Sequence, residues 1–320
     1  MSNAVADVYA GCGDDEEPSG AETTVFAGAV AAISPRSEVL RLLPSRGRRM
    51  VGAWCFADVF GPRPVSGGAA MHVPPHPHTG LQTVSWLAAG AVTHRDSLGN
   101  LAEVTPGRVA VMTAGHGIAH SEDVVPASAV LHGAQLWVAL SEAERHRPPS
   151  FTLHERAPYV DAGGVLAQVF VGAVGDVRAP AQGLTPLLGA ELTWSSPGPG
   201  RLALETSFEH VLVPLAGQAR VDGSAVRVGS AMYLGRARTE LEVELDEDAR
   251  VLLLGGEPFE EEIVMWWNFV AGSHEEIADA RQRWNAGGDP RFGEVDYPTA
   301  ERMAAPALPN VRLRPRGRVR

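Results

Sequence analysis

Two pairs of metal-ligand residue types stand out in this sequence: His76 with His78, and His120 with Glu122. Successive side chains on a β-strand point to opposite faces, so residues two positions apart share one face. We expect each pair to project from one strand, and the two strands to lie side by side in a small barrel. Three imidazoles and one carboxylate would then surround one point. This ligand set suits a divalent transition metal, namely iron, manganese, nickel, copper or zinc.

The alternative for each of these histidines is a hydrogen-bonded residue of a barrel wall. A lone histidine would favour that interpretation, but four ligand types at paired spacing, flanked by Pro and Gly turns, favour a metal site. Four ligands leave two positions of a six-coordinate metal open for a substrate or dioxygen. Glu122 could then act both as a weak ligand and as the catalytic proton acceptor.

Several polar residues near the two pairs have weaker claims to a role. Gln82 follows the first pair by four positions and is expected on the same strand face, either to orient a metal-bound water or as a hydrogen-bonded core residue. His116 lies on the approach to His120 and could hydrogen-bond a bound substrate. Like His116, His72 and His94 could each be a donor behind the ligands, a substrate contact or a surface residue.

The elements that must position these side chains are short strands. Apolar runs broken at close intervals by Gly, Pro, Asn and Asp fill most of the chain, which is typical of a β-sandwich or barrel. The chain repeats one pattern of strands and Gly turns, which indicates a duplicated barrel. The first copy is WLAAGAVTHRDSLGN with VTPGRVAVMTAG, and the second is PLAGQARVDGSAVRVGSAMYLG. A helix is expected at SHEEIADARQRWNAGG, where Ser273 and Glu276 form a capping box and Gly287 supplies the stop. The predicted fold is all-β, with two tandem barrels and a short C-terminal helix.

We expect four regions along the chain: a disordered leader at 1–22, an N-terminal metal-binding barrel at 23–147, a second barrel at 148–295 and an Arg-rich tail at 296–320. The second barrel has His210 but no counterpart of the two pairs, so we expect one metal site, in the first barrel. The tail should be a solvated terminus, with contact to an acidic patch or to nucleic acid as the alternative.

Composition narrows the classes of function. The net charge of −11 gives no broad basic surface, so nucleic-acid binding as the main activity is disfavoured. All 27 basic residues are Arg, which excludes chemistry that needs a Schiff-base or phosphate-loop lysine. Cys12 and Cys55 lie in very different contexts, which argues against a disulfide and makes the reducing cytoplasm the expected location. No apolar stretch reaches a membrane-spanning length.

Five blocks of the sequence, in this order, resemble the pirin family of two-domain cupins: PPHPHTGLQTVSWL, HRDSLGN, PGRVAVMTAGHGIAHSE, LHGAQLWVAL and GEPFEEEIVMWWNFV. The resemblance implies a bicupin fold with one non-haem metal, usually Fe(II), in the N-terminal barrel. The family's ligand positions fall here on His76, His78, His120 and Glu122.

Two positions depart from the residues usual in that family. Gln82 stands where many pirins have Glu, and His116 stands where many have Arg. Gln82 is not at one of the family's ligand positions, so the metal site should survive. The two changes bear on substrate preference and on how the surroundings tune the metal.

Some pirins act as quercetin 2,3-dioxygenases, and others as transcriptional or metabolic co-regulators. The resemblance therefore implies a metal-dependent dioxygenase that acts on a flavonoid-like polyphenol or a related enol. The alternative is a non-enzymatic, metal- or redox-responsive regulator that binds a partner protein. An isomerase or another small-molecule cupin enzyme stays open, because this barrel hosts many chemistries.

Overall fold

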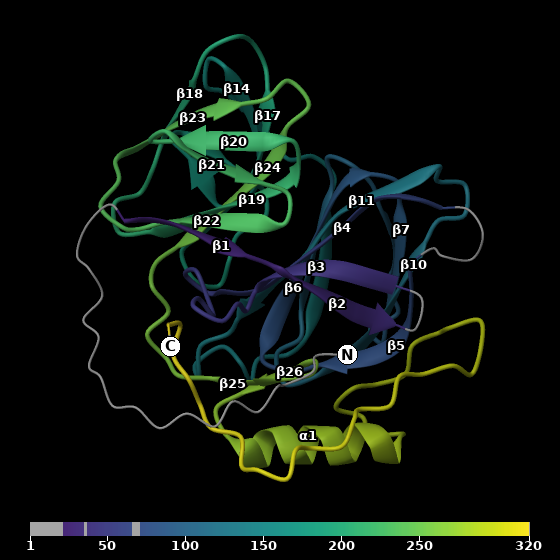
Figure 1. Cartoon of the computed structure of the whole chain (residues 1–320). Helices are drawn as coiled ribbons and strands as arrows, with labels where there is room; N and C mark the ends of the chain where they lie inside the picture. The colour runs from purple at the N-terminus through teal and green to yellow at the C-terminus, as the bar shows by residue number, and fades with distance from the viewer. Residues whose placement is uncertain (1–21, 35–36, 66–70, 320) are drawn as a thin grey trace.

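The computed structural model describes residues 22–34, 37–65 and 71–319, and the predicted leader lies almost wholly outside them. Strands dominate the described part of the chain and form two barrels that lie against each other (Figure 1). Within the same residues there is one helix, α1, at His274–Ala286. The predicted all-β fold, with two barrels and a short C-terminal helix, is therefore confirmed.

The N-terminal barrel is built from two antiparallel sheets. The larger has the strand order β12 (Ser150–His154), β9 (Val109–Thr113), β6 (Leu81–Ala89), β11 (Val130–Ala139), β4 (Trp54–Pro64), β3 (Ser37–Leu43) and β2 (Ala29–Ser34). The smaller has the order β5 (His72–His78), β10 (Ile118–Val124), β7 (Val92–Asp96) and β8 (Leu101–Val104). The two pairs of candidate ligands thus lie on neighbouring strands of the smaller sheet.

The second barrel repeats this design. Its larger sheet has the order β1 (Thr23–Ala27), β22 (Ser230–Leu234), β19 (Glu209–Ala216), β24 (Arg250–Gly256), β17 (Leu187–Trp194), β14 (Val165–Val171) and β13 (Tyr159–Asp161). Its smaller sheet has the order β18 (Gly200–Ala203), β23 (Glu240–Leu245), β20 (Gln218–Val221) and β21 (Ser224–Arg227). The remaining strands form two hairpins: β15 (Ala173–Val174) with β16 (Val177–Arg178), and β25 (Val264–Trp266) with β26 (Phe269–Ala271).

Hydrogen bonding between strands crosses the boundary that the sequence predicts near residue 147. Strand β1 pairs with β22 of the second barrel, although it precedes the first barrel in the chain. Strand β12, which follows the predicted boundary, pairs with β9 of the first barrel. The barrels are therefore joined by exchanged strands, and the residue ranges of the two domains stay a prediction.

One hydrophobic cluster spans both barrels and includes residues of strand β4. Residues Trp54 to Phe60 are buried on both faces of that strand, as expected where a strand is covered on each side. The Trp54 Nε1–H lies 3.0 Å from the Gly255 oxygen in the second barrel, and Trp86 stacks on Phe170 at 4.7 Å between ring centroids. This apolar interface, with its few satisfied polar groups, fixes one barrel against the other.

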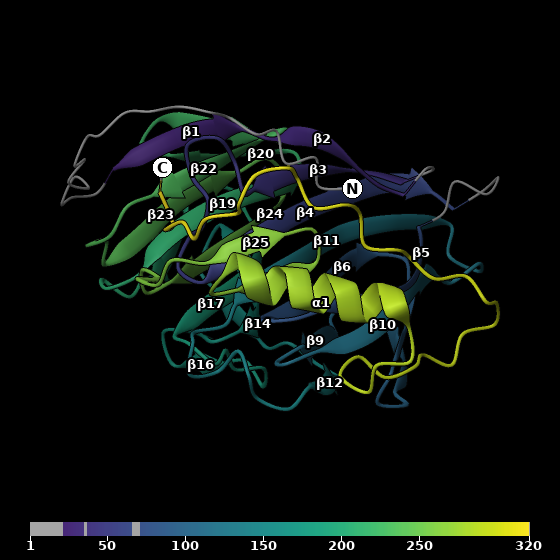
Figure 2. The same cartoon turned by 90° about the horizontal axis from the view of Figure 1, so that it is seen from below.

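Helix α1 follows the expected capping pattern and lies across the underside of the barrels (Figure 2). Ser273 is the N-cap and its hydroxyl accepts a hydrogen bond from the Glu276 N–H, while Gly287 ends the helix with a φ of 77°. The buried face carries Ile277 and Trp284. Among the described residues, no helix is both long and apolar enough to cross a membrane.

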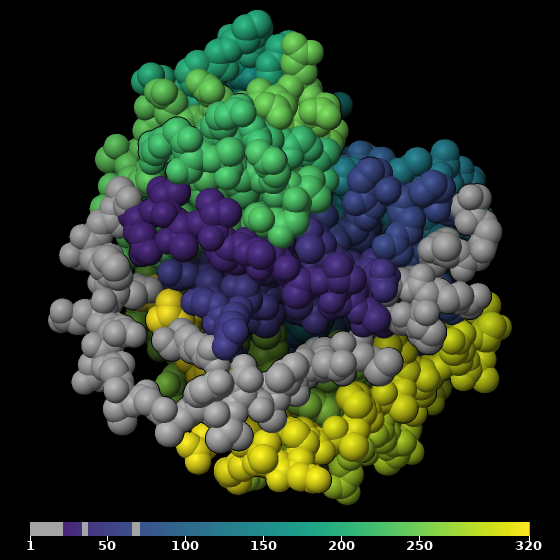
Figure 3. All heavy atoms as spheres, in the orientation of Figure 1, coloured from purple at the N-terminus to yellow at the C-terminus, as the bar shows by residue number. Residues whose placement is uncertain are grey.

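The Arg-rich tail is only partly a solvated terminus: Arg312, Arg314 and Arg316 are exposed, but the tail also contacts acidic side chains, as the alternative had it. It runs back over the lower face of the molecule, where the C-terminal segment is yellow (Figure 3). Arg316 forms a two-way backbone bridge with Ile263, and Arg318 Nη1 lies 3.0 Å from Oε2 of Glu209 in the second barrel. Glu209 is fully buried, so the tail supplies a cation to a carboxylate that water does not reach.

Candidate metal centre

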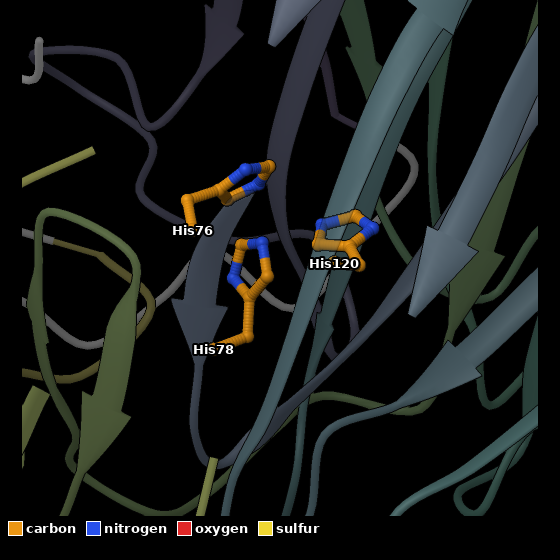
Figure 4. Close-up of side chains that lie close together, drawn as sticks. All are labelled: His76, His78 and His120. Atoms are coloured by element: carbon orange, nitrogen blue, oxygen red, sulfur yellow. The ribbon is translucent and has the colours of Figure 1, made fainter. Parts of the chain in front are cut away.

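Three histidines from two antiparallel strands meet inside the first barrel (Figure 4). His76 and His78 come from β5, and His120 on β10 is the register partner of His76. One ligand nitrogen from each ring lies within 4.8 Å of those of the other two. All three side chains are buried, with exposures of 5%, 1% and 1%. The strand alternation thus brings the predicted imidazoles together.

Hydrogen bonds to backbone oxygens fix the protonation of two of the rings. His76 Nδ1 lies 2.9 Å from the Pro74 oxygen, and His78 Nδ1 lies 3.1 Å from the Asn268 oxygen. A carbonyl oxygen can only accept, so each Nδ1 must carry the proton and each Nε2 must keep its lone pair. Burial lowers the pKa of His76 to about 4 and the pKa of His78 well below its usual value. Both rings are therefore neutral, as metal binding requires.

His120 completes the set with an unused nitrogen. Its Nε2 is buried and has no hydrogen-bond partner among the described residues, a costly arrangement unless something binds there. In Figure 4 one ring nitrogen of His120 faces His76 and His78, and the other faces away from them. Convergent imidazole nitrogens that lack a protein partner fit a divalent transition metal. The residues present therefore suit the group that the sequence predicts.

Glu122 lies beside this trio rather than at its centre. The pairing of β10 with β5 shifts register between His120 and Glu122, so Glu122 is opposite Val73 on β5. On the other side of β10, in regular register, Glu122 is opposite His94 on β7. Its carboxylate groups with His94 and His120, again within 4.8 Å. The four predicted ligands thus belong to two trios that share His120, and the second trio also contains His94, which the predicted quartet does not include. Whether Glu122 is a ligand stays a prediction.

The carboxylate of Glu122 is held in an apolar setting with one hydroxyl near it. Burial raises its pKa above the ordinary value; His94, when that ring is protonated, and a hydrogen bond from Ser85 oppose the rise. Ser85 Oγ lies 3.2 Å from Glu122 Oε1 and 2.8 Å from Gln135 Oε1. The Ser85 hydroxyl has one proton, so it can donate to only one of these two side chains at a time. It donates to Glu122 when the Gln135 side-chain amide donates a hydrogen bond to the Ser85 oxygen instead of accepting one from it.

Gln82 lies on a different strand from the one expected and is a hydrogen-bonded core residue, the alternative that the sequence left open, while His116 lies just before the strand of His120. Strand β5 ends at His78 and β6 begins at Leu81, so Gln82 is on the next strand, where its amide donates to the Thr113 hydroxyl at 2.9 Å. His116 lies in the turn before β10, and its carbonyl oxygen accepts a hydrogen bond from Arg291 Nε. Neither residue lines the cavity next to the histidines.

A cavity of about 90 Å³ opens beside the trio, lined by His76, His78 and Glu122 at one end and mainly by apolar side chains elsewhere. Trp137 forms one wall, stacks on Phe56 at 3.9 Å between ring centroids, and has a buried Nε1–H without a partner among the described residues. A carboxylate also lines the cavity, Asp58, which Arg41 binds at 2.8 and 2.7 Å. The site therefore pairs metal-ligand types with an apolar pocket.

Among the contributors to this pocket that sequence reasoning missed are Trp137, Asp58 and Asn268. Trp137 stands in the LHGAQLWVAL block, so its place near the site could have been suspected from that motif. Asp58 lies in the otherwise apolar run from Trp54 to Phe60, and a carboxylate in such a run is itself a signal of a specific role. Asn268 acts through its backbone oxygen, and no side-chain pattern reveals that contact.

Two antiparallel barrels in one chain, with histidines converging inside the first, define the protein as a bicupin. A profile described as Pirin matches residues 36–138, and one described as Pirin C-terminal cupin domain matches residues 192–293. The chain therefore belongs to the pirin family.

Its relatives match both barrels. A Pseudomonas aeruginosa protein named "Putative quercetin 2,3-dioxygenase" is 46% identical over 271 residues, which cover 85% of this chain and 86% of that protein. A pirin-like protein of Caulobacter vibrioides is 36% identical, with 78% of this chain and 88% of the relative covered. The crystal structure of a quercetin 2,3-dioxygenase from Acinetobacter baumannii has a TM-score of 0.87 and 39% identity, and covers 91% of this chain and 97% of that one.

Proposed function

We propose that this protein is a metal-dependent dioxygenase that opens the ring of a flavonol-like enol, as quercetin 2,3-dioxygenases do. The observation that carries the proposal is that two histidines of the trio, His76 and His78, line an apolar cavity, because a structural metal would need no such access. The names of the relatives from P. aeruginosa and A. baumannii support the same substrate class.

The metal that we propose is Fe(II), held by His76, His78, His120 and Glu122. Manganese, nickel, copper and zinc suit the same ligand types, so the donor set alone does not select among them. When bound, the metal supplies a Lewis acid and a coordination position for the substrate hydroxyl oxygen and for dioxygen. The protein supplies neutral imidazoles that need not lose a proton before they bind.

Glu122 is the proposed catalytic base. The substrate hydroxyl must lose its proton before the ring can react with dioxygen, and Glu122 is a carboxylate that lines the cavity. Burial raises its pKa, and a base whose pKa is nearer to neutrality accepts a proton more effectively. The apolar walls around Trp137 hold the aromatic body of the substrate and exclude water.

Oxygen uptake by the iron-reconstituted full chain with quercetin and several other flavonols tests this proposal. We expect uptake by the wild type and by His146→Ala, which changes an exposed histidine, and a loss of uptake in His76→Ala. Metal binding without uptake on any flavonol would overturn the proposal. That result would favour a metal- or redox-responsive regulator that binds a partner protein. A cytoplasmic location stays a prediction from the cysteine content.

A further inference from the structure

His94 lies directly behind His120, on the neighbouring strand β7. The Nδ1 atoms of the two rings are 3.4 Å apart, and both side chains are buried. The other nitrogen of His94, Nε2, lies 3.1 Å from Oδ2 of Asp96. Asp96, His94 and His120 thus form a row that ends at the unpartnered Nε2 of His120.

The direction of the hydrogen bonds in this row follows from Asp96. Its Oδ1 accepts hydrogen bonds from the backbone N–H groups of Leu98 and Asn100, at 2.9 and 3.1 Å, which marks the group as a carboxylate. A carboxylate can only accept, so His94 must donate through Nε2–H. With its one ring proton on Nε2, His94 has a lone pair on Nδ1, which can accept a hydrogen bond from a neighbour.

We propose that His94 is a positioning residue for the metal centre: by accepting a hydrogen bond from His120 Nδ1–H, it keeps the His120 Nε2 lone pair available to a divalent cation. This inference rests on the proposed metal site. The other two ligands meet the same need differently, since their Nδ1–H groups donate to the backbone oxygens of Pro74 and Asn268. No backbone oxygen serves His120 among the described residues, and His94 takes that place.

Packing holds the His94 ring in the orientation that it needs to accept a hydrogen bond from His120. Its ring stacks on Phe151 with centroids 4.1 Å apart and planes within 9°. The 3.4 Å separation from His120 is longer than an ideal hydrogen bond. A cation on Nε2 draws electron density from the His120 ring and makes its Nδ1–H a stronger donor, so the bond and the metal reinforce each other.

A competing arrangement uses the same atoms differently. His94, His120 and Glu122 also place one ligand atom each within 4.8 Å, so these residues could hold an ion of their own. His120 cannot offer Nδ1 to a second ion and keep the proton there. The two arrangements therefore differ in the number of ions per chain and in the effect of removing His94.

Two substitutions of His94 separate a positioning role from a packing role. His94→Phe keeps a flat ring for Phe151 but removes the acceptor, while His94→Gln restores an oxygen that can accept from His120 and an amide N–H that can donate to Asp96. His132→Phe is the matched control, because His132 is a buried histidine of the same barrel that bonds to the Leu215 oxygen.

Competition titration of Co²⁺ against a chelator, on the full chain, measures the effect. We expect one ion per chain throughout, about 10- to 100-fold weaker binding in His94→Phe, and near wild-type binding in His94→Gln and His132→Phe. Unchanged affinity in a folded His94→Phe would overturn the proposal. So would two ions in the wild type that fall to one in this variant.

Nitrogen NMR of isotope-labelled apoprotein gives a second test that needs no folded His94→Phe. The His120 signals, assigned by their loss in His120→Gln, should show a protonated Nδ1 and an unprotonated Nε2. The opposite tautomer would contradict the proposal. Neither the titration nor the NMR measures turnover, so failure of the dioxygenase proposal alone would leave both results standing.

Discussion

His78 donates a hydrogen bond from Nδ1 to the backbone oxygen of Asn268, at 3.1 Å and across 190 residues of sequence. The donor belongs to β5 of the first barrel, and the acceptor lies in the turn of the β25–β26 hairpin, which follows the second barrel. Trp267, next to the acceptor, has a φ of 53°, in the left-handed region that costs a residue with a side chain about 1–2 kcal/mol. A strained turn distant in sequence therefore orients a candidate ligand.

The left-handed turn predicts a difference between two substitutions of Trp267. Trp267→Asn and Trp267→Val both remove the indole, but Asn tolerates a positive φ and a β-branched residue does not. We expect the Val variant to lose about 1–2 kcal/mol of unfolding free energy relative to the Asn variant, and to bind Co²⁺ more weakly. Urea unfolding and competition titration measure both. Equal values for the two variants would show that this turn does not position His78.

The buried histidines predict a stability that falls on the acid side. The ordinary pKa of histidine is 6.5, and burial lowers that of His76 to about 4 in the folded protein. Between these values the unfolded chain binds more protons, so the unfolding free energy of the apoprotein is highest above pH 6.5 and declines as the pH falls toward 4. For His76 alone the full decline is on the order of 3 kcal/mol.

Urea unfolding at several pH values between 7 and 4.5 checks this slope. The variant His76→Gln should show a shallower decline than the wild type, because it removes one group that must stay neutral in the fold. His146→Gln, at an exposed position, is the control and should keep the wild-type slope. Identical slopes for all three proteins would mean that His76 is not held neutral by burial.

The sequence predicts the histidine trio because alternation along a strand is a local property. His76 and His78 share a face whatever their neighbours are, and the pairing with His120 follows from the barrel. The position of Gln82 could not be predicted in that way, since a two-residue turn after His78 places Gln82 on the next strand. The shift that brings Glu122 opposite Val73 on β5, and the pairing with β7 that brings it opposite His94, depend on which strand pairs with which, and this too is decided by tertiary packing.

Other features depend on contacts that no local pattern encodes. The alternating Arg residues of the tail predict a solvated terminus, because such a charge pattern is usually exposed. In the fold, Arg318 reaches a buried carboxylate that belongs to a strand more than a hundred residues earlier. The C-terminal helix, by contrast, begins and ends where its own capping residues predict, at Ser273 and Gly287.

Glu122→Gln tests the proposed base. The amide keeps the size of the side chain but cannot accept the substrate proton, so we expect turnover to fall by about 10²- to 10⁴-fold while the apoprotein stays folded. Glu103→Gln, which changes an exposed carboxylate on β8 of the same barrel, should leave turnover unchanged. Oxygen uptake normalised to metal content is the measurement. Full metal content together with full turnover in Glu122→Gln would remove Glu122 from the mechanism.

The contact of the tail with Glu209 predicts a large loss of stability from a residue near the end of the chain. Burial raises the pKa of Glu209, and Arg318 opposes that rise most strongly. Arg318→Ala should therefore lower the unfolding free energy by about 1–3 kcal/mol, since Glu209 keeps its other hydrogen bonds. The control Arg314→Ala, at an exposed position, should change it little. If both variants unfold at the same urea concentration, the tail does not stabilise the fold.

Trp137 lines the cavity, and its buried N–H group has no partner among the described residues. An oxygen of a bound substrate would satisfy this donor, and one such hydrogen bond contributes about 0.5–1.5 kcal/mol. Trp137→Phe keeps an aromatic ring against Phe56 and loses the N–H, so we expect the KM for a flavonol to rise by about 2- to 10-fold, with unchanged Co²⁺ affinity. Trp194→Phe, away from the cavity, controls for loss of an indole. An unchanged KM in Trp137→Phe would mean that the substrate is not held at this wall.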